Sequence, residues 1–241
     1  MISESERRVI LAARDTRRLG DLLAGDPALA ARALEQWCDH PKCERPLTFI
    51  AMLRFDAARL GISGDLADTG GIARALLAAG APVDGDPGER ETPLMTAASY
   101  GDAAVARELI AAGADLEALA APNAGGVPGG SALLHAAVFG MTDVLDALVA
   151  AGARIRGIEE AAAAGDLGAW LTPETDPEAR IRALVMAADH ERLGVIDELL
   201  AAGTPIDATD AVWHRQAMRV ARENGRAASV AHLLARGASG A

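Results

Sequence analysis

The sequence predicts an all-α fold made of stacked helix–turn–helix units, and three observations support this prediction. Apolar residues make up 51% of the chain but aromatic residues only 3%, and most of the apolar residues are Ala and Leu, which are strong helix formers. Five segments end alike, with apolar residues at helical spacing followed by a glycine. Four of these five contain a matching earlier helix at a fixed distance from that glycine.

The shared ending is typical of a helix that stops at a glycine with positive φ. Successive glycines at this point lie 33, 39, 51 and 34 residues apart. The basic step is therefore close to 33 residues, with two insertions. The five segments are 72-IARALLAAGA-81, 104-AVARELIAAGA-114, 143-DVLDALVAAGA-153, 194-GVIDELLAAGT-204 and 228-ASVAHLLARGA-238.

The earlier helix begins 21 residues before the glycine in four segments. In the first of them we expect Thr92 to cap the helix and Pro93 to occupy its first turn, where no N–H is needed. Gly101 is expected to open the turn, and the small Ala97 and Ala98 let two helices approach. The four segments are 92-TPLMTAASYGD, 131-SALLHAAVFGM, 182-RALVMAADHER and 216-QAMRVARENGR.

The 33-residue step, the TPLxxAA opening and the LLxxGA ending resemble those of ankyrin repeats. The resemblance implies an all-α ankyrin-repeat solenoid of stacked helix–turn–helix units with hairpin-like fingers. In that family a histidine after Thr-Pro-Leu hydrogen-bonds neighbouring repeats. We expect these histidine bonds to be missing here and the stack to depend more on apolar packing, because the position is occupied by Thr48, Met95, Leu134, Val185 and Arg219.

The resemblance also implies a single ankyrin-repeat domain over residues 1–241. Its parts are an N-terminal cap and loop (1–44), repeats (45–153), an insertion or degenerate repeat (154–180), and C-terminal repeats with a cap (181–241).

Within these parts, three segments depart from the regular pattern. A first helix is expected at 45–61, followed by a long loop at 62–71. The inserted segment is expected to form a helix at 158–170. Residues 120–130 lengthen one finger.

Charge and hydropathy limit the classes of partner. The formal net charge is −11 and the pI is about 4.9, so the surface repels phosphate backbones and no nucleic-acid partner is expected. No window reaches the length of an apolar membrane span, and the opening MISESERRVI has no signal-peptide core. We therefore expect a cytoplasmic protein with no membrane partner, and the Ala, Gly and Arg usage is typical of a GC-rich bacterial genome.

Few residues suggest chemistry. Cys38, His40 and Cys43 could supply three metal ligands, but a structural zinc site takes four ligands, usually in closely spaced pairs, so we expect free thiols and no metal. His135 could act as a general base, but its place in the first-helix motif favours a structural role. The sequence contains no nucleophile elbow, phosphate-binding loop or HExxH motif. No catalytic residue and no cofactor is therefore expected.

In ankyrin stacks the two residues before the turn of each first helix face a concave groove, and the fingers face the partner. Tyr100 and Phe139 occupy equivalent groove positions although the chain has one Tyr and three Phe, which favours an interface. The implied partner-binding residues are Ser99, Tyr100, Val138, Phe139, Asp189, His190, Glu223 and Asn224 in the groove, and Glu91, Trp213 and Arg215 in the fingers.

These patterns favour a non-catalytic module that binds another protein through the groove and fingers. The alternative is a small-molecule-binding protein or enzyme on the same scaffold, with a pocket closed by the inserted loops. In that alternative His135 or His190 would serve as the acid or base.

Overall fold

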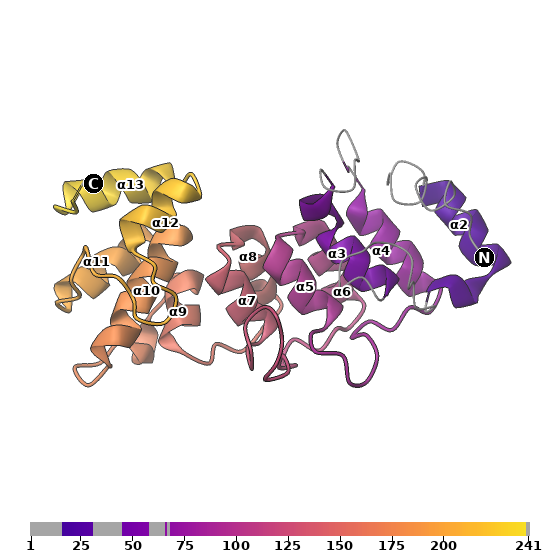
Figure 1. Ribbon diagram of the computed structural model, residues 1–241, viewed down its shortest axis with the longest axis horizontal. Coiled ribbons are helices and arrows are strands. Elements are labelled where there is room, and N and C mark those ends of the chain that lie inside the picture. The colour runs from indigo at the N-terminus through magenta and orange to yellow at the C-terminus, as the bar shows by residue number, and fades with distance from the viewer. Residues whose placement is uncertain (1–15, 31–44, 58–65, 67, 240–241) are drawn as a thin grey trace.

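The computed structural model describes residues 16–30, 45–57, 66 and 68–239. These residues form an elongated helical array with α2 at one end and α13 at the other (Figure 1). Over the same residues the only β pairing is an isolated bridge between Thr209 and Gln216. The expected all-α stack is therefore confirmed.

The helices lie in two layers, and the first layer holds the helix that begins each unit. Consecutive helices of this layer pack on one another, and their buried faces are rich in alanine. Small side chains let helix axes approach closely, so one face of each helix can contact both neighbours. The first layer consists of α3 (Pro46–Asp56), α5 (Pro93–Tyr100), α7 (Ala132–Val138), α9 (Ile158–Ala164), α10 (Pro177–Asp189) and α12 (Ala217–Glu223).

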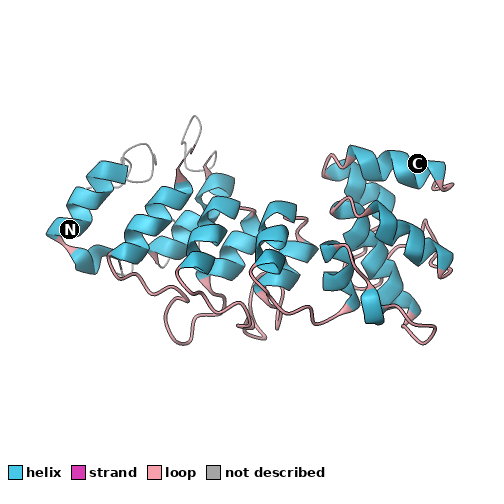
Figure 2. Ribbon diagram, turned by 180° about the vertical axis from the view of Figure 1, so that it is seen from behind, coloured by secondary structure: helices cyan, strands magenta, loops and turns pink. Residues whose placement is uncertain are grey.

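The second layer holds the helix that ends each unit. In it α2 packs on α4, α4 on α6, α6 on α8, and α11 on α13. The connecting loops extend from the lower edge of the array (Figure 2). The layer consists of α2 (Thr16–Gly25), α4 (Thr69–Ala78), α6 (Ala103–Ala111), α8 (Thr142–Ala150), α11 (Leu193–Ala201) and α13 (Ala227–Ala235), and two short 3-10 helices complete the described elements, η1 (Pro27–Ala30) and η2 (Gly168–Trp170).

The signals that predicted the helix ends act as expected in α5. The Thr92 hydroxyl accepts a hydrogen bond from the Met95 N–H at 3.2 Å, and Pro93 occupies the first turn. Gly101 ends the helix with φ 78°, a conformation that glycine adopts without steric cost. The local sequence therefore sets both ends of this helix.

Two predicted boundaries are wrong. The helix expected at 45–61 ends at Asp56, and α4 begins at Thr69, inside the segment expected to be loop. Asp68 caps α4 by accepting a hydrogen bond from the Gly71 N–H at 2.9 Å, which explains the early start.

The segment 158–170 is a repeat that lacks its second helix. Its helix α9 ends at Gly165, where φ is 99°, so it is shorter than the expected helix. The short η2 takes the place of the first turn of a second helix, and the chain then leads directly into α10. The second layer is therefore interrupted between α8 and α11 (Figure 1).

Candidate protein-binding surface

Three aromatic side chains lie at the ends of consecutive first-layer helices. Phe55, at the end of α3, is 67% exposed, and its ring centroid lies 5.0 Å from that of Tyr100, the last residue of α5. Phe139 occupies the equivalent position directly after α7 and is 38% exposed. It meets the His135 ring edge-on, with centroids 6.3 Å apart.

A finger from the last repeat adds a fourth aromatic residue. Arg215 Nη1 donates to the Val138 carbonyl at 2.6 Å, and the Arg215 guanidinium lies 5.5 Å from the centre of the Trp213 ring. Because Val138 precedes Phe139, this finger lies beside the end of α7 although it is 77 residues away in sequence. We call Phe55, Tyr100, Phe139 and Trp213 the aromatic row.

The finger is held in shape by one buried carboxylate. Asp210 is 1% exposed and accepts hydrogen bonds from the backbone N–H groups of Val212 at 3.0 Å, Trp213 at 2.6 Å and Arg215 at 2.9 Å. Burial lowers the pKa of Arg215, but a guanidinium remains protonated in proteins. A fixed positive charge therefore lies beside Trp213.

His135 joins neighbouring repeats, which corrects the expectation that such histidine bonds are missing. It is fully buried. Its Nδ1 lies 2.9 Å from the Ser99 hydroxyl of the preceding unit, and its Nε2 lies 3.2 Å from the Val127 carbonyl. Both ring nitrogens have partners, so His135 is structural, as its place in the motif indicated.

Glu160 makes the corresponding link at the next junction. It is 2% exposed and accepts a hydrogen bond from the Ser131 hydroxyl at 3.0 Å. It also accepts one from the Arg156 backbone N–H. Burial raises the pKa of this carboxyl, against the effect of these two donors. Polar links therefore join the repeats in addition to apolar packing.

Three residues predicted to face the groove are buried instead, so their predicted orientation is wrong. Val138 is 6%, Asp189 1% and His190 2% exposed. The Thr142 hydroxyl lies 2.9 Å from His190 Nδ1, and the Ala137 carbonyl lies 3.0 Å from Nε2. Burial lowers the pKa of His190. Because the repeat between them is short, the end of α10 reaches back to α7 and these side chains become internal.

Asp189 is the centre of this internal contact. Its Oδ1 accepts hydrogen bonds from Asn224 Nδ2 at 2.7 Å and from Arg226 Nε at 3.4 Å. Arg226 also donates to the Gly140 carbonyl. We call Asp189, His190, Arg215 and Arg226, together with the end of α7, the buried seam.

The other predicted binding residues have varied positions. Glu91 is half-buried and accepts a hydrogen bond from the Gly126 N–H at 2.7 Å, which ties two fingers together. Ser99 is occupied by its bond to His135. Glu223 and Asn224 are exposed in the last repeat. Of the predicted set, Tyr100, Phe139 and Trp213 belong to the aromatic row, and the Arg215 guanidinium lies beside Trp213.

Sequence reasoning missed Phe55 as a surface residue. The available signal was a Phe near the end of a first helix, in a chain with only three Phe. Its neighbour Tyr100 belongs to the next unit, 45 positions further on, so the pair becomes evident only in three dimensions.

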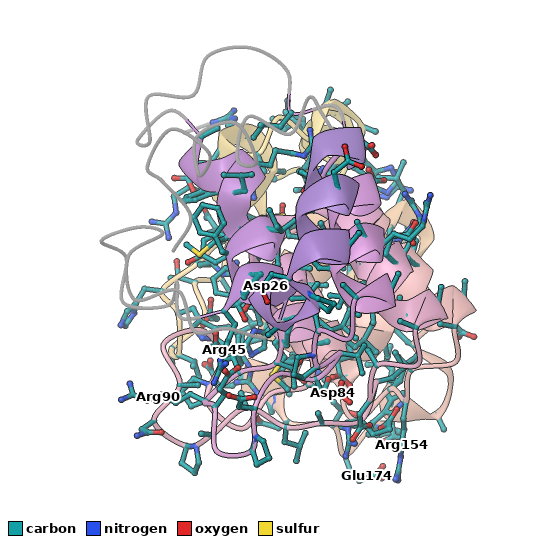
Figure 3. The ribbon with its side chains drawn as sticks, turned by 90° about the vertical axis from the view of Figure 1, so that its right-hand side faces the viewer. Asp26, Arg45, Asp84, Arg90, Arg154 and Glu174 are labelled. Carbon is teal, nitrogen blue, oxygen red and sulfur yellow. The ribbon has the colours of Figure 1, made fainter. Side chains whose placement is uncertain are left out.

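Carboxylates link successive loops along one edge of the array. Asp84 accepts a hydrogen bond from the Asp115 N–H at 2.8 Å, and Glu117 accepts one from the Arg154 N–H at 2.8 Å. Figure 3 views the array from its α2 end and shows Asp84 and Arg154 on the same edge. Hydrogen bonds to an ionised acceptor are stronger than those between neutral groups. These bonds therefore hold each loop in place against the next.

Other candidate sites gain no support. Cys38, His40 and Cys43 lie outside the described residues. Within the described part, no group of three or more His, Cys, Asp or Glu side chains could hold a metal ion. None of the helices described combines the length and apolar content needed to cross a bilayer.

Comparison with known proteins agrees with this architecture. Residues 65–157 match the family model for ankyrin repeats in three copies, from just before α4 to the residue preceding α9. A comparison with curated proteins gave no match. The helices α10 to α13, beyond the matched region, form the same two-layer packing. The chain therefore contains ankyrin repeats over residues 65–157.

Proposed function

We propose that this protein binds another protein through the aromatic row and has no catalytic activity. Ankyrin repeats are generally protein-interaction modules. The observation that supports this site is the pairing of Phe55 with Tyr100 from the next unit, with Phe139 at the equivalent place in the unit after that. Phe55 is 67% and Phe139 38% exposed. Exposed apolar patches of this kind mark interaction sites.

The chemistry of the row favours a protein partner. Aromatic residues and arginine are the residue types that most often dominate binding energy at interfaces. Arg215 supplies a positive charge beside Trp213, whereas the net charge of the chain is −11. The partner surface is therefore expected to carry apolar groups that fit the Phe and Tyr rings. The sequence favours a cytoplasmic partner.

The test is affinity capture from native lysate followed by quantitative mass spectrometry. The wild-type chain is compared with a Tyr100→Ala/Phe139→Ala double variant and with Leu234→Ala as the control. Leu234 is 45% exposed but lies in the second layer, so its loss tests for general stickiness of exposed apolar residues.

We expect one or more proteins to be retained by the wild type and the control and lost with the double variant. Loss of two interface aromatics should cost about 2 kcal/mol or more, or a roughly 30-fold weaker binding constant. Equal retention by all three chains, or retention of no protein by the wild type, would contradict the proposal. Circular dichroism establishes that each variant is folded.

A further inference from the structure

The interruption of the second layer leaves an apolar position of α8 uncovered. The relevant position is the third residue before the glycine that ends each second-layer helix. It is half-buried where another second-layer helix follows, and exposed where none follows. The half-buried residues are Leu77, Ile110 and Leu200, and the exposed ones are Val149, at 37%, and Leu234, at 45%. Val149 therefore resembles the end of the array, although it lies near the middle of the chain.

Charged residues at two junctions between second-layer helices follow the same positional rule. Arg74 in α4 donates to Glu108 in α6 at 2.9 and 2.5 Å, and Asp197 in α11 lies 2.8 Å from His232 in α13. In both pairs, the sixth residue before the glycine of one helix meets the fifth residue before the glycine of the next. At the junction of α6 and α8 the same two positions are Arg107 and Ala147, so the rule describes where a charge faces the neighbouring helix when one is present.

At the interruption, this rule leaves two carboxylates directed at the missing helix. On α8 the position is taken by Asp146, whose side chain is 54% exposed and contacts Arg192. On α11 it is taken by Glu198, which is exposed and has no side-chain hydrogen bond or ion pair to the residues that the structure describes. Both walls of the interruption therefore carry a carboxylate; that of Glu198 is unpaired among the described residues, and that of Asp146 is shared with Arg192.

The face of α11 toward the interruption is also open. Where α4 and α6 touch, a Cβ on Gly70 would lie 3.2 Å from the Ala104 side chain. Gly194 occupies in α11 the position that Ala104 has in α6, and a Cβ there would meet no atom within 4 Å. At the end of η2, where a second helix would continue, Trp170 is 42% exposed.

We propose that this interruption, bounded by Asp146 and Val149 of α8, Trp170 of η2, and Gly194 and Glu198 of α11, binds a basic amphipathic helix of a partner protein. The helix takes the place of the absent second helix, with its apolar side on Val149 and Trp170. Burial of these side chains stabilises the complex, and charge complementarity with the two carboxylates selects the partner.

The positional rule specifies the charges of this helix. One basic residue faces Glu198 as Arg74 faces Glu108, and the following residue faces Asp146. Two consecutive basic residues are therefore expected near the middle of the helix. This site lies in the second layer and is independent of the aromatic row in the first layer.

The probe is a fluorescein-labelled peptide with the sequence of residues 102–114, which spans α6, carrying Glu108→Arg. In the peptide, Arg107 is thus followed by a second basic residue. We expect saturable binding to the full chain in fluorescence anisotropy, with Kd at or below about 100 µM. Val149→Asp and Glu198→Arg should each weaken binding about tenfold or more, and a peptide with Glu at position 107 should restore binding to the Glu198→Arg chain.

Two controls locate the site. Leu234→Asp changes the corresponding exposed residue at the end of the array, and Tyr100→Ala/Phe139→Ala changes the aromatic row; both chains should bind the peptide like the wild type. No saturable binding at about millimolar peptide, or equal weakening by Leu234→Asp and Val149→Asp, would overturn the proposal. Sedimentation that detects a dimer abolished by Val149→Asp would assign the site to a second copy of the chain and would also overturn it.

Discussion

The regular repeats from α3 to α8 and the shortened repeat around α9 join their neighbours in different ways. In the regular part, side chains bridge adjacent units, as in the Ser99–His135 contact at 2.9 Å and the Arg74–Glu108 ion pair. Across the shortened repeat, long side chains bridge units that are not adjacent in sequence. Arg192 reaches both the Ala163 carbonyl at 2.7 Å and the Asp146 carboxylate.

The comparison teaches how a stack accommodates the loss of a helix. The last carbonyls of a helix have no partner within the helix. At the end of α7 the carbonyls of Ala137, Val138 and Gly140 are contacted by the side chains of His190, Arg215 and Arg226. Arginine suits this role because it combines reach with five N–H donors, and a cation at a helix C-terminus also interacts favourably with the helix dipole.

The largest effect is expected from Gly140→Ala, which attacks the buried seam directly. Gly140 has φ 71°, and a Cβ there would lie 2.6 Å from Asp189 Oδ2, which is fixed by Asn224 and Arg226. Backbone strain and overpacking together should lower the free energy of unfolding by about 3 kcal/mol.

Gly113→Ala is the matched control for this change. Gly113 has φ 86°, but a Cβ there would meet nothing within 4 Å, so only the strain of about 1 kcal/mol remains. Urea denaturation followed by circular dichroism measures both variants. Equal urea midpoints for the two variants would show that the added methyl group at position 140 is accommodated beside Asp189 without further loss of stability.

A smaller but clear loss is expected from Asp189→Ala. The change removes a buried acceptor and leaves Asn224 and Arg226 without their contact. Removing one partner of a fully buried ion pair costs about 3–5 kcal/mol. Because the Arg226 side chain is 25% exposed and water can reach it, we expect about 2 kcal/mol in urea denaturation.

Asp197→Ala tests an exposed ion-pair contact between two second-layer helices, for comparison with the buried one at Asp189. Asp197 bonds to Arg236 and His232 on the surface of the second layer, and the Arg236 hydrogen bond lowers its pKa. Exposed ion pairs contribute little to stability. The urea midpoint of Asp197→Ala should therefore shift by less than half as much as that of Asp189→Ala. A larger shift would contradict the expectation that ion pairs in the buried seam stabilise the fold more than those on the surface.

Lower pH should destabilise the seam through His190. Its pKa is 6.5 when unperturbed and lower in the folded chain because of burial. Between these two pKa values the unfolded state binds more protons, so the free energy of unfolding falls as pH falls below about 6.5. The neighbouring charges are Asp189, which favours protonation, and Arg192 and Arg226, which oppose it.

His190→Asn should flatten this dependence when urea midpoints are compared from about pH 7.5 to about pH 5.5. Glu160→Gln provides a comparison, because Glu160 contributes a pH dependence of the free energy of unfolding of opposite sign. The pKa of Glu160 is raised by burial from 4.5, so the folded state binds more protons and stability falls as pH rises from about 4.5 through the folded pKa. An unchanged slope in the His190 variant would exclude this histidine as the source.

The smallest effect is expected in the carboxylate contacts between loops. Asp84→Ala removes the acceptor of the Asp115 N–H at an exposed position and should cost about 0.5 kcal/mol. Asp84→Asn keeps a side-chain oxygen and should recover most of the loss. If both variants melt like the wild type in calorimetry, these contacts order the loops without stabilising them.

The sequence predicted the features that depend on local residues. Thr92 and Gly101 set the ends of α5 because capping and positive φ act within a few residues. The Ala-Ala-Ala-Ala-Gly-Asp run at 161–166 matches the turn at 97–102 and could have identified α9 as a first helix. The missing second helix hid this match, because the LLxxGA ending that marks each repeat does not follow.

Long-range features could not be predicted from the same patterns. The burial of Asp189 and His190 depends on α10 reaching α7 across a shortened unit. The finger that contacts the end of α7 is distant in sequence, since Arg215 donates to the Val138 carbonyl across 77 residues. The position of a residue within a repeat indicates on which face of its helix the residue lies. It does not indicate which distant unit covers that face.

The contacts of Arg215 and Arg226 with the end of α7 span 77 and 86 residues. A simple solenoid has contacts only between neighbours, so its ends can fray independently and its folding can begin in any unit. Here the last repeat is attached to the middle of the chain, which raises the contact order and the entropic cost of closing the loop. The terminal repeat should therefore unfold together with α7 as one cooperative unit, and native-state hydrogen exchange should give both the same opening free energy.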